Sequence, residues 1–292
     1  MPTYRFKQVD AFTSRPLFGN PVAVVLEADT LSAEQMRRIA NWTNLSETTF
    51  VLKPSVPRPA YRLRIFTPTH ELPFAGHPTI GSCHAVLESG VVAPADGRLV
   101  QECGAGNLSI RIEGDGPERH IGVEAPEAKL MGEYPELRPR LTDILGAPVA
   151  QTPPPTAFRN GPTWLFVRFE KESDVAGLKP DMSPLAALSA DHRGTGVAAF
   201  ALLDGGEFAV HIRCFAPAAG VPEDPVTGSA NAALPAYLVH HGLLDRTGRA
   251  YVATQATEMG RDGRVPVRVL DETGRAEIGG QAVTVIDGEI SI

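Results

Sequence analysis

Apolar and polar residues alternate over short stretches along most of this chain, which is the pattern of β-strands with one buried face. In the first half, this pattern predicts strands at residues 3–12, 21–28, 47–54, 60–68, 98–106, 108–114 and 119–125. In the second half, it predicts strands at residues 160–170, 196–203, 208–217, 250–257, 265–271 and 281–288. Each half is therefore expected to form a β-sheet.

Helical segments interrupt the strands at similar places in both halves. Ser32 is followed three residues later by Gln35, which is a capping box and predicts the start of a helix. Ser183 precedes Pro184, and proline is well tolerated in a first helical turn, so we expect Ser183 to cap a second helix. Pro235 should kink a later helix, because it lacks an N–H group. The predicted helices cover residues 31–42, 78–87, 182–192 and 227–242, with a brief one at 137–146.

A fragment of the first half recurs in the second half. Residues 64–90 and 213–242 both read as a strand, a turn with proline and glycine, and the start of a helix. At a spacing of 149 residues, the matching pairs are Arg64 and Arg213, Phe66 and Phe215, Pro68 and Pro217, and Pro73 and Pro222. After a shift of two residues, Gly81, Ser82, Ala85 and Leu87 match Gly228, Ser229, Ala232 and Leu234. The spacing predicts a fused duplicate rather than a solenoid of short repeats.

The length of the chain agrees with two domains. A chain of 292 residues exceeds the usual size of one domain. We expect an N-terminal lobe of residues 1–125, to which the C-terminal strand at 281–292 could add, and a C-terminal lobe of residues 126–280. The proline-rich segment 126–155 is the expected connector. The fold class predicted from this order of elements is α+β.

Composition narrows the class of protein. The formal charge is −7 and the basic residues are scattered, which argues against nucleic acid and anionic membranes as partners. The chain lacks an apolar run that could span a bilayer, and its start does not have the layout of a signal peptide. Three cysteines are too few for a disulfide framework and lack metal-ligand spacing. A cytoplasmic enzyme or binding protein without a metal or cofactor is the expectation.

His77 is the first candidate for chemistry. It precedes Pro78, and a residue before proline is biased away from the helical region, so we expect His77 just outside the helix. A helix N-terminus disfavours the imidazolium ion, so His77 is expected to be neutral. The alternative is a histidine that only caps its own helix.

The second candidate is the turn that contains Asp224. Thr227, Gly228 and Ser229 open the helix that follows, and N–H groups at a helix start can hold a substrate carboxylate. The neighbouring Glu223 is expected to be the solvated acid of the turn. The alternative is that Asp224 or Thr227 is only an N-cap.

Glu47 is the third candidate. It follows Ser46 where a polar loop becomes an apolar strand. Phe50 and Phe200 match at a spacing of 150 residues, which would place Val197 at the position equivalent to Glu47. A carboxylate partly buried there would have a raised pKa and could act as a general base. The alternative is a charge that faces solvent.

These motifs together resemble a known family. FGNPVAVV, NLSETTF, ELPFAGHPTIG and EDPVTGSAN occur in the order and over the length of the phenazine-biosynthesis isomerase family PhzF. The resemblance implies the fold of diaminopimelate epimerase: two pseudo-symmetric domains, each a mixed sheet or barrel around a central helix, with an active cleft between them. It also implies roles for the matching positions. The implied catalytic residues are Glu47, His77 and Asp224, and the implied substrate-binding residues are Asn20, Ser46, Gly76, Gly228 and Ser229.

The epimerase relatives implied by this fold use two cysteines at the facing helix ends. Those ends carry no cysteine here, because Cys83 falls inside a predicted helix and Cys214 inside a predicted strand. The chain therefore argues against a two-thiol racemase.

The function expected from the residues and the resemblance is a cofactor-independent isomerase of a small carboxylic acid, for which a cyclic amino acid is the family's model substrate. Glu47 would move a proton between two carbons. His77 and Asp224 would hold the substrate and assist the proton, while Gly228 and Ser229 would anchor its carboxylate. One alternative is a catalytically silent binding or regulatory protein. Another is a racemase that uses Glu47 and His77 at one stereocentre. The resemblance also implies a homodimer.

Overall fold

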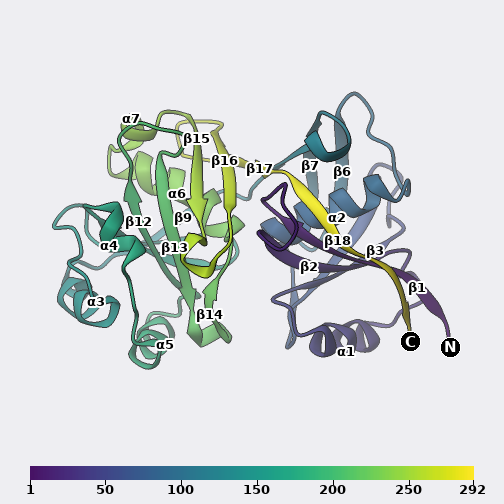
Figure 1. Ribbon diagram of the computed structural model, residues 1–292, viewed down its shortest axis with the longest axis horizontal. Helices are drawn as coiled ribbons and strands as arrows, with labels where there is room; N and C mark the ends of the chain where they lie inside the picture. The colour runs from purple at the N-terminus through teal and green to yellow at the C-terminus, as the bar shows by residue number, and fades with distance from the viewer. The chain divides into compact units, whose positions relative to one another are not determined.

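The computed structural model describes residues 1–292, which separate into two compact units. The first unit contains residues 1–124 and 279–292, and the second contains residues 125–278. Each unit has a curved sheet around one buried helix (Figure 1). No helix has both the length and the apolar character that crossing a membrane requires.

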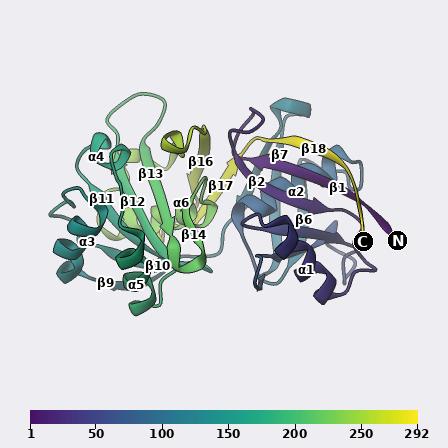
Figure 2. The same ribbon diagram turned by 60° about the horizontal axis from the view of Figure 1, so that its bottom comes forward.

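The first unit has a mixed sheet in the order β18–β1–β2–β3–β4–β6–β7–β8, with the short strand β5 added to β4. Figure 2 shows β1 and β18 side by side, although they come from opposite ends of the chain. The strands are β1 (Thr3–Ala11), β2 (Asn20–Val25), β3 (Thr48–Leu52), β4 (Tyr61–Phe66), β5 (Glu71–Leu72), β6 (Arg98–Cys103), β7 (Gly106–Glu113), β8 (His120–Glu124) and β18 (Ala282–Ser291).

The helix α2 (Gly76–Glu88) is the centre of the first unit. It packs against β1, β2, β3, β4, β8 and β18, and all its residues from Gly76 to Val86 are buried. A helix buried on every side needs small residues where a strand approaches closely. Gly81 is one of them, since a Cβ there would lie 2.4 Å from a methyl group of Val22.

The helix α1 (Ala33–Thr43) packs a second apolar cluster that includes Met36 and Phe50. Ser32 accepts a hydrogen bond from the N–H of Gln35, and the Gln35 side chain accepts one from the N–H of Ser32. The predicted capping box is therefore confirmed.

The second unit repeats this topology. Its sheet has the order β9–β10–β11–β12–β13–β15–β16–β17, with the short strand β14 added to β13. The strands are β9 (Lys129–Glu133), β10 (Thr156–Arg159), β11 (Thr163–Phe169), β12 (Gly196–Leu202), β13 (Val210–Ala216), β14 (Val221–Asp224), β15 (Ala250–Gln255), β16 (Gly263–Val269) and β17 (Ala276–Gly280). The helices are α3 (Arg138–Leu145), α4 (Glu172–Ala176), α5 (Met182–Asp191), α6 (Gly228–His240) and α7 (Leu244–Thr247).

The helix α6 takes the place of α2. It packs against β10, β11 and β16, and its residues from Ala230 to Leu238 are buried. It runs through Pro235, and the kink predicted there stays a prediction. Tyr237 on this helix contacts the rings of Phe166 and Phe200, which form the aromatic part of the core.

The strand register corrects the spacing between the two copies. Thr48 pairs with Phe66 in the first unit, and Val197 pairs with Phe215 in the second, so the offset is 149 residues along both strands. The match of Phe50 with Phe200 at 150 residues is therefore wrong. A shift of one residue would turn every side chain to the opposite face of the sheet.

The first residues of the two central helices correct a second match between the two sequence copies. Both central helices begin at a glycine, Gly76 in α2 and Gly228 in α6. The equivalent of Ser229 is therefore His77, and the match of Gly228 and Ser229 with Gly81 and Ser82 is wrong. The turns before the two helices differ in length. Equivalent residues after the turns are therefore separated by a different number of positions from equivalent residues before them.

Several elements were not predicted from the sequence. The expected connector at residues 126–155 contains the unpredicted strand β9, and the unpredicted β10 follows directly, whereas α3 confirms the brief helix predicted at 137–146. The strands β5, β14 and β17 and the helix α4 are too short to show a period. Helix α5 is capped by Asp181, which accepts a hydrogen bond from the N–H of Ser183, so the prediction of Ser183 as the cap is wrong.

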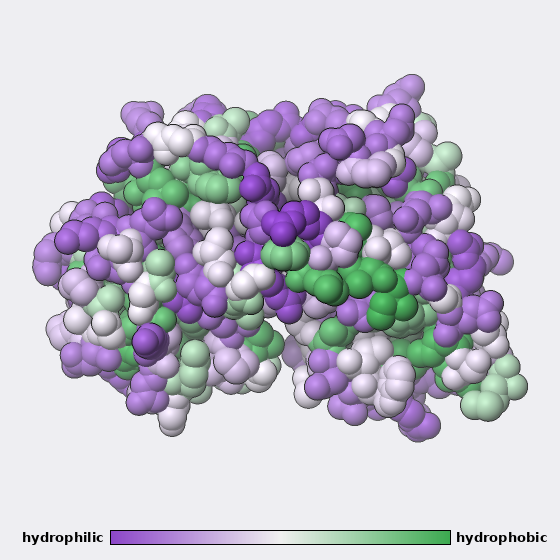
Figure 3. All heavy atoms as spheres, in the orientation of Figure 1, coloured by the Kyte–Doolittle hydropathy of each residue, from purple (hydrophilic) through white to green (hydrophobic).

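The face shown in Figure 3 is mostly polar, with an apolar patch over β18. Ile286 on this strand is 47% exposed.

Candidate functional site

Three of the predicted residues of the first unit are in contact. The Nδ2 of Asn20 lies 3.3 Å from the Nδ1 of His77, and the Nε2 of His77 lies 3.2 Å from the Oε2 of Glu47. Asn20 begins β2, and Glu47 lies in the turn between α1 and β3, beside Ser46. Asn44 ends α1 in the left-handed region at φ 53°, which turns the chain toward this position. The fold thus brings together residues that are far apart in the sequence.

The contacts determine where His77 carries its proton. The Asn20 amide nitrogen can only donate, so the Nδ1 of His77 accepts. The Nε2 then carries the proton and lies 3.2 Å from the Glu47 carboxylate, without the geometry of a hydrogen bond. Burial lowers the pKa of His77 to about 3, so the ring is neutral at physiological pH. Glu47 therefore lies beside a neutral ring that brings no positive charge to its carboxylate.

The position of His77 differs from the prediction in one respect. His77 is the second residue of α2, with Ala75 as the N-cap, so it lies inside the helix rather than just outside it. Pro78 is tolerated as the third residue because the first N–H groups of a helix have no intrahelical partner. The bias of a residue before proline is overridden here by packing, since His77 is only 5% exposed.

The second unit has no room for a carboxylate at the position equivalent to Glu47. The register makes Gly196 the equivalent residue, so the prediction of Val197 is wrong. A Cβ on Gly196 would lie 2.1 Å from the carbonyl oxygen of Phe215 and 2.9 Å from the Trp164 ring. Any side chain there would clash with backbone, which confines the carboxylate to the first unit.

Asp224 belongs to a hydrogen-bonded network at the start of α6. The hydroxyl of Thr227 donates to Asp224 Oδ2 at 2.8 Å, and the Gln255 side chain donates to the Asp224 carbonyl at 2.9 Å. Gln255 also accepts from the N–H of Thr227 and from the side chain of Asn231. Thr227 is the N-cap of α6, although its side chain does not make the cap hydrogen bond. The network holds the Asp224 turn against the helix start.

Ser229 is held from two sides by the hairpin of β10 and β11. The indole N–H of Trp164 donates to the Ser229 hydroxyl oxygen at 2.9 Å, and the Asn160 side chain donates to its carbonyl at 2.9 Å. Because the indole only donates, the Ser229 hydroxyl proton remains available for another acceptor. Sequence reasoning missed Trp164 and Asn160, which carry no motif of their own.

A repeated ion pair precedes each central helix. Arg64 donates two hydrogen bonds to Glu71, and Arg213 donates two to Glu223 at 2.8 and 2.9 Å. The expectation of a solvated Glu223 is therefore wrong, since its side chain is only 15% exposed. Arg213 also donates to three backbone carbonyls at and just after the C-terminal end of α4. The repeated arginine was visible in the sequence, but its partner was not, because the two turns differ in length.

The cysteines are unsuited to acid–base chemistry in these surroundings. Burial raises the pKa of Cys83 to about 12 and that of Cys214 well above its usual value. Both thiols therefore stay protonated near neutral pH and are poor bases.

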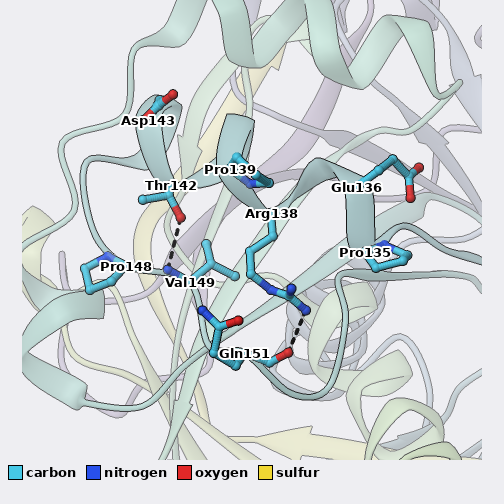
Figure 4. A pocket seen from close by; sticks show the side chains of 9 residues that line it. All are labelled: Pro135, Glu136, Arg138, Pro139, Thr142, Asp143, Pro148, Val149 and Gln151. Carbon is cyan, nitrogen blue, oxygen red and sulfur yellow. Dashed lines mark hydrogen bonds between the residues drawn. The ribbon is translucent and has the colours of Figure 1, made fainter.

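A surface hollow of the second unit contains none of the predicted residues. It is lined by α3 and the loop after it, with Arg138, Thr142 and Gln151 among its residues (Figure 4). Arg138 donates to the carbonyl of Gln151 at 2.6 Å, which ties the loop to the helix. The hollow is therefore separate from both groups described above.

The low pKa of His77 predicts an acid-sensitive fold. Between pH 6.5 and 5, the unfolded chain protonates this residue and the folded chain does not, so acid favours unfolding. We expect a loss of about 2 kcal/mol over this interval from His77 alone. Urea unfolding at pH 7 and pH 5 should show a smaller loss for His77→Gln, whereas the exposed His70→Gln should behave like wild type. Equal losses in all three proteins would contradict a neutral His77.

A family model described as phenazine biosynthesis-like protein matches residues 9–288. The chain belongs to this family. Trans-2,3-dihydro-3-hydroxyanthranilate isomerase of Pseudomonas aeruginosa is 36% identical over 285 residues, which cover 97% of this chain and 94% of the relative. A protein of Schizosaccharomyces pombe named antisense-enhancing sequence 1 is 39% identical over 296 residues, which cover 99% of both.

Solved structures agree with the family. The crystal structure of a PhzF-family phenazine biosynthesis protein from Bacillus anthracis matches with a TM-score of 0.85 at 28% identity and covers 100% of both chains. Structures of a proline racemase and a hydroxyproline epimerase share the fold at lower identity. The predicted family and fold class are therefore confirmed. The isomerase names among the relatives agree with the predicted class of enzyme.

Proposed function

We propose that this protein is a cofactor-independent isomerase of a small carboxylic acid, with Glu47 as its general base. The neutral His77 ring, whose Nε2 lies 3.2 Å from the Glu47 carboxylate, is the observation that carries the assignment. A carboxylate that acts as a base must be free to take a proton, and a neutral neighbour does not hold it in an ion pair. The substrate class follows from relatives whose printed name contains a hydroxylated anthranilate, which is an amino-bearing cyclic carboxylic acid.

The proposed reaction is a proton shift within one molecule. Glu47 takes a proton from a carbon next to a conjugated system, and the C–H electron pair enters that system. The same carboxyl group then returns the proton to another carbon, so that a double bond moves and no external reagent is consumed. Proton transfer by a positioned side chain contributes about 10²–10⁴-fold in rate.

The residues of the second unit are proposed to bind the same substrate. The N–H groups at the start of α6 and the hydroxyl of Ser229 suit a carboxylate, because they donate and lie at the positive end of a helix dipole. Asp224 suits an amino or hydroxyl group of the substrate, since a carboxylate accepts. Gly76 and Ser46 are proposed to line the site in the first unit.

The experiment that tests this proposal follows isotope at carbon. The protein is incubated in D₂O with cyclic amino-bearing carboxylic acids, and NMR locates any deuterium. Isomerase activity predicts deuterium at a new carbon together with a displaced double bond. Exchange at one stereocentre without a displaced bond would instead support a racemase. Thermal stabilisation by an acid without any exchange would support a silent binding protein.

The role of Ser229 makes a separate prediction. Ser229→Ala removes one hydrogen bond to a charged group, so kcat/KM should fall roughly 10-fold to 100-fold, mainly through a higher KM. Steady-state kinetics measure both constants. Ser183→Ala, on the exposed face of α5, is the matched control and should leave them unchanged. An unchanged KM in Ser229→Ala would remove this residue from substrate binding.

The expected homodimer and the cytoplasmic location remain predictions.

A further inference from the structure

A cluster of metal-ligating side chains lies at the other end of α6. Glu133 at the end of β9 and the consecutive residues His240 and His241 place one ligand atom each within 4.8 Å of the others. The Nε2 of His240 lies 2.7 Å from the Oε1 of Glu133. We propose that these three residues form a binding site for a divalent transition metal of the zinc type.

The surroundings of His241 leave one of its ring nitrogens ready for a metal. The hydroxyl of Thr156 donates to the carbonyl of Pro154 at 2.8 Å, so its oxygen accepts from the Nε2 of His241 at 2.9 Å. The proton of His241 is therefore on Nε2, and the lone pair is on Nδ1. A metal-binding histidine usually donates its other N–H to such a partner, which fixes the tautomer and the ring orientation.

Packing holds both imidazole rings in place. The His241 ring lies edge-on to Tyr237, with 4.6 Å between the ring centroids, and the His240 ring lies edge-on to Phe158 at 6.0 Å. Because packing already restricts the side-chain torsions of both histidines, less conformational entropy is lost when a metal binds. Meanwhile the side chains of Glu133 and His240 are 44% and 35% exposed, so an ion can reach them from solvent.

Acid should compete with a metal at this site, because imidazole and carboxylate groups bind a metal in their deprotonated forms. A metal would replace the proton that His240 shares with Glu133, which makes binding weaker in acid.

The ligand set indicates the kind of metal. Two imidazole nitrogens and one carboxylate oxygen are a known ligand set of zinc, which then keeps a fourth position for water. Magnesium and calcium prefer oxygen ligands alone, so they should bind poorly. A metal there would link β9 to the C-terminal end of α6, whose N-terminal end carries the proposed substrate-binding residues. The proposal does not depend on the isomerase activity.

The test is calorimetric titration of the full-length protein with Zn²⁺ and with Mg²⁺. Wild type should bind one Zn²⁺ per chain and show a raised melting temperature, with no comparable response to Mg²⁺. Glu133→Gln, His240→Gln and His241→Gln should each weaken Zn²⁺ binding at least about 10-fold. His70→Gln removes an exposed histidine elsewhere and is the matched control. Circular dichroism without metal checks that each variant is folded.

Two further measurements separate a built site from loose binding by surface histidines. Thr156→Val removes no ligand, but it takes away the acceptor for His241 and should weaken binding roughly 10–100-fold. Bound Co²⁺ should give the intense visible bands of a four-coordinate site, and these bands should be lost in His241→Gln. Zinc affinity that is the same in wild type and in all three ligand variants would overturn the proposal. So would a wild type that binds no zinc.

Discussion

Glu47→Gln is expected to lower kcat about 10²–10⁴-fold and to abolish deuterium incorporation at carbon. A glutamine amide has nearly the shape of the carboxylate and can occupy the same place beside His77. The contact between Asn20 and His77 should therefore survive, while the proposed base is lost. Substrate binding, measured by thermal shift, should change little.

The control for this variant is Glu34→Gln, which removes an exposed carboxylate from α1 in the same unit. It should retain wild-type kcat and wild-type isotope exchange. Full activity in Glu47→Gln would refute the assignment of the base. If binding were lost together with activity, Glu47 would act by holding the substrate, and the proton would have to be taken by another group.

Arg213→Met is expected to destabilise the second unit by about 3–5 kcal/mol. The Arg213 side chain is only 6% exposed and its partner Glu223 only 15% exposed. Methionine can fill the space of the aliphatic part, but it leaves the Glu223 carboxylate without its two hydrogen bonds from Arg213. It also removes donors from three backbone carbonyls, including those of Val175 and Leu178. Unpaired buried charge is among the largest destabilising effects available to one substitution.

The chain offers a matched control in its other half. Arg64→Met breaks the equivalent pair with Glu71, whose side chains are 20% and 41% exposed. Water can solvate the glutamate left behind, so the loss should be about 1 kcal/mol or less. Urea unfolding at pH 7 measures both variants. Equal losses would show that burial does not decide the strength of this repeated pair.

The comparison of the two units explains why Glu47 has no counterpart in the second unit. Both units have the same strand order, and both have an arginine–glutamate pair before a central helix. The difference lies in the packing of β12, where Gly196 lies against the Phe215 carbonyl and the Trp164 ring. Trp164 in turn positions Ser229. Trp164 therefore lies against position 196, where the Phe215 carbonyl excludes a side chain, and also donates a hydrogen bond to the Ser229 hydroxyl.

Secondary-structure elements that are determined by residues close in sequence were predictable. The capping box at Ser32 and the long strands β1, β11 and β13 follow from local periodicity, because each is determined by which side chains are apolar. Elements of two to five residues, such as β5, β14 and α4, were missed, since so few positions show no period. They exist because a longer strand or a buried ion pair supports them.

The sequence by itself determined the family, the duplication and the candidate residues, because motifs and repeats are properties of order along the chain. Only the tertiary structure decided which residues of the two copies are equivalent, since strand register and helix starts make Gly196 the equivalent of Glu47 and Ser229 the equivalent of His77. It also decided the burial of His77 and of Glu223. Burial and hydrogen bonding join residues distant in sequence, and no local pattern encodes those distances.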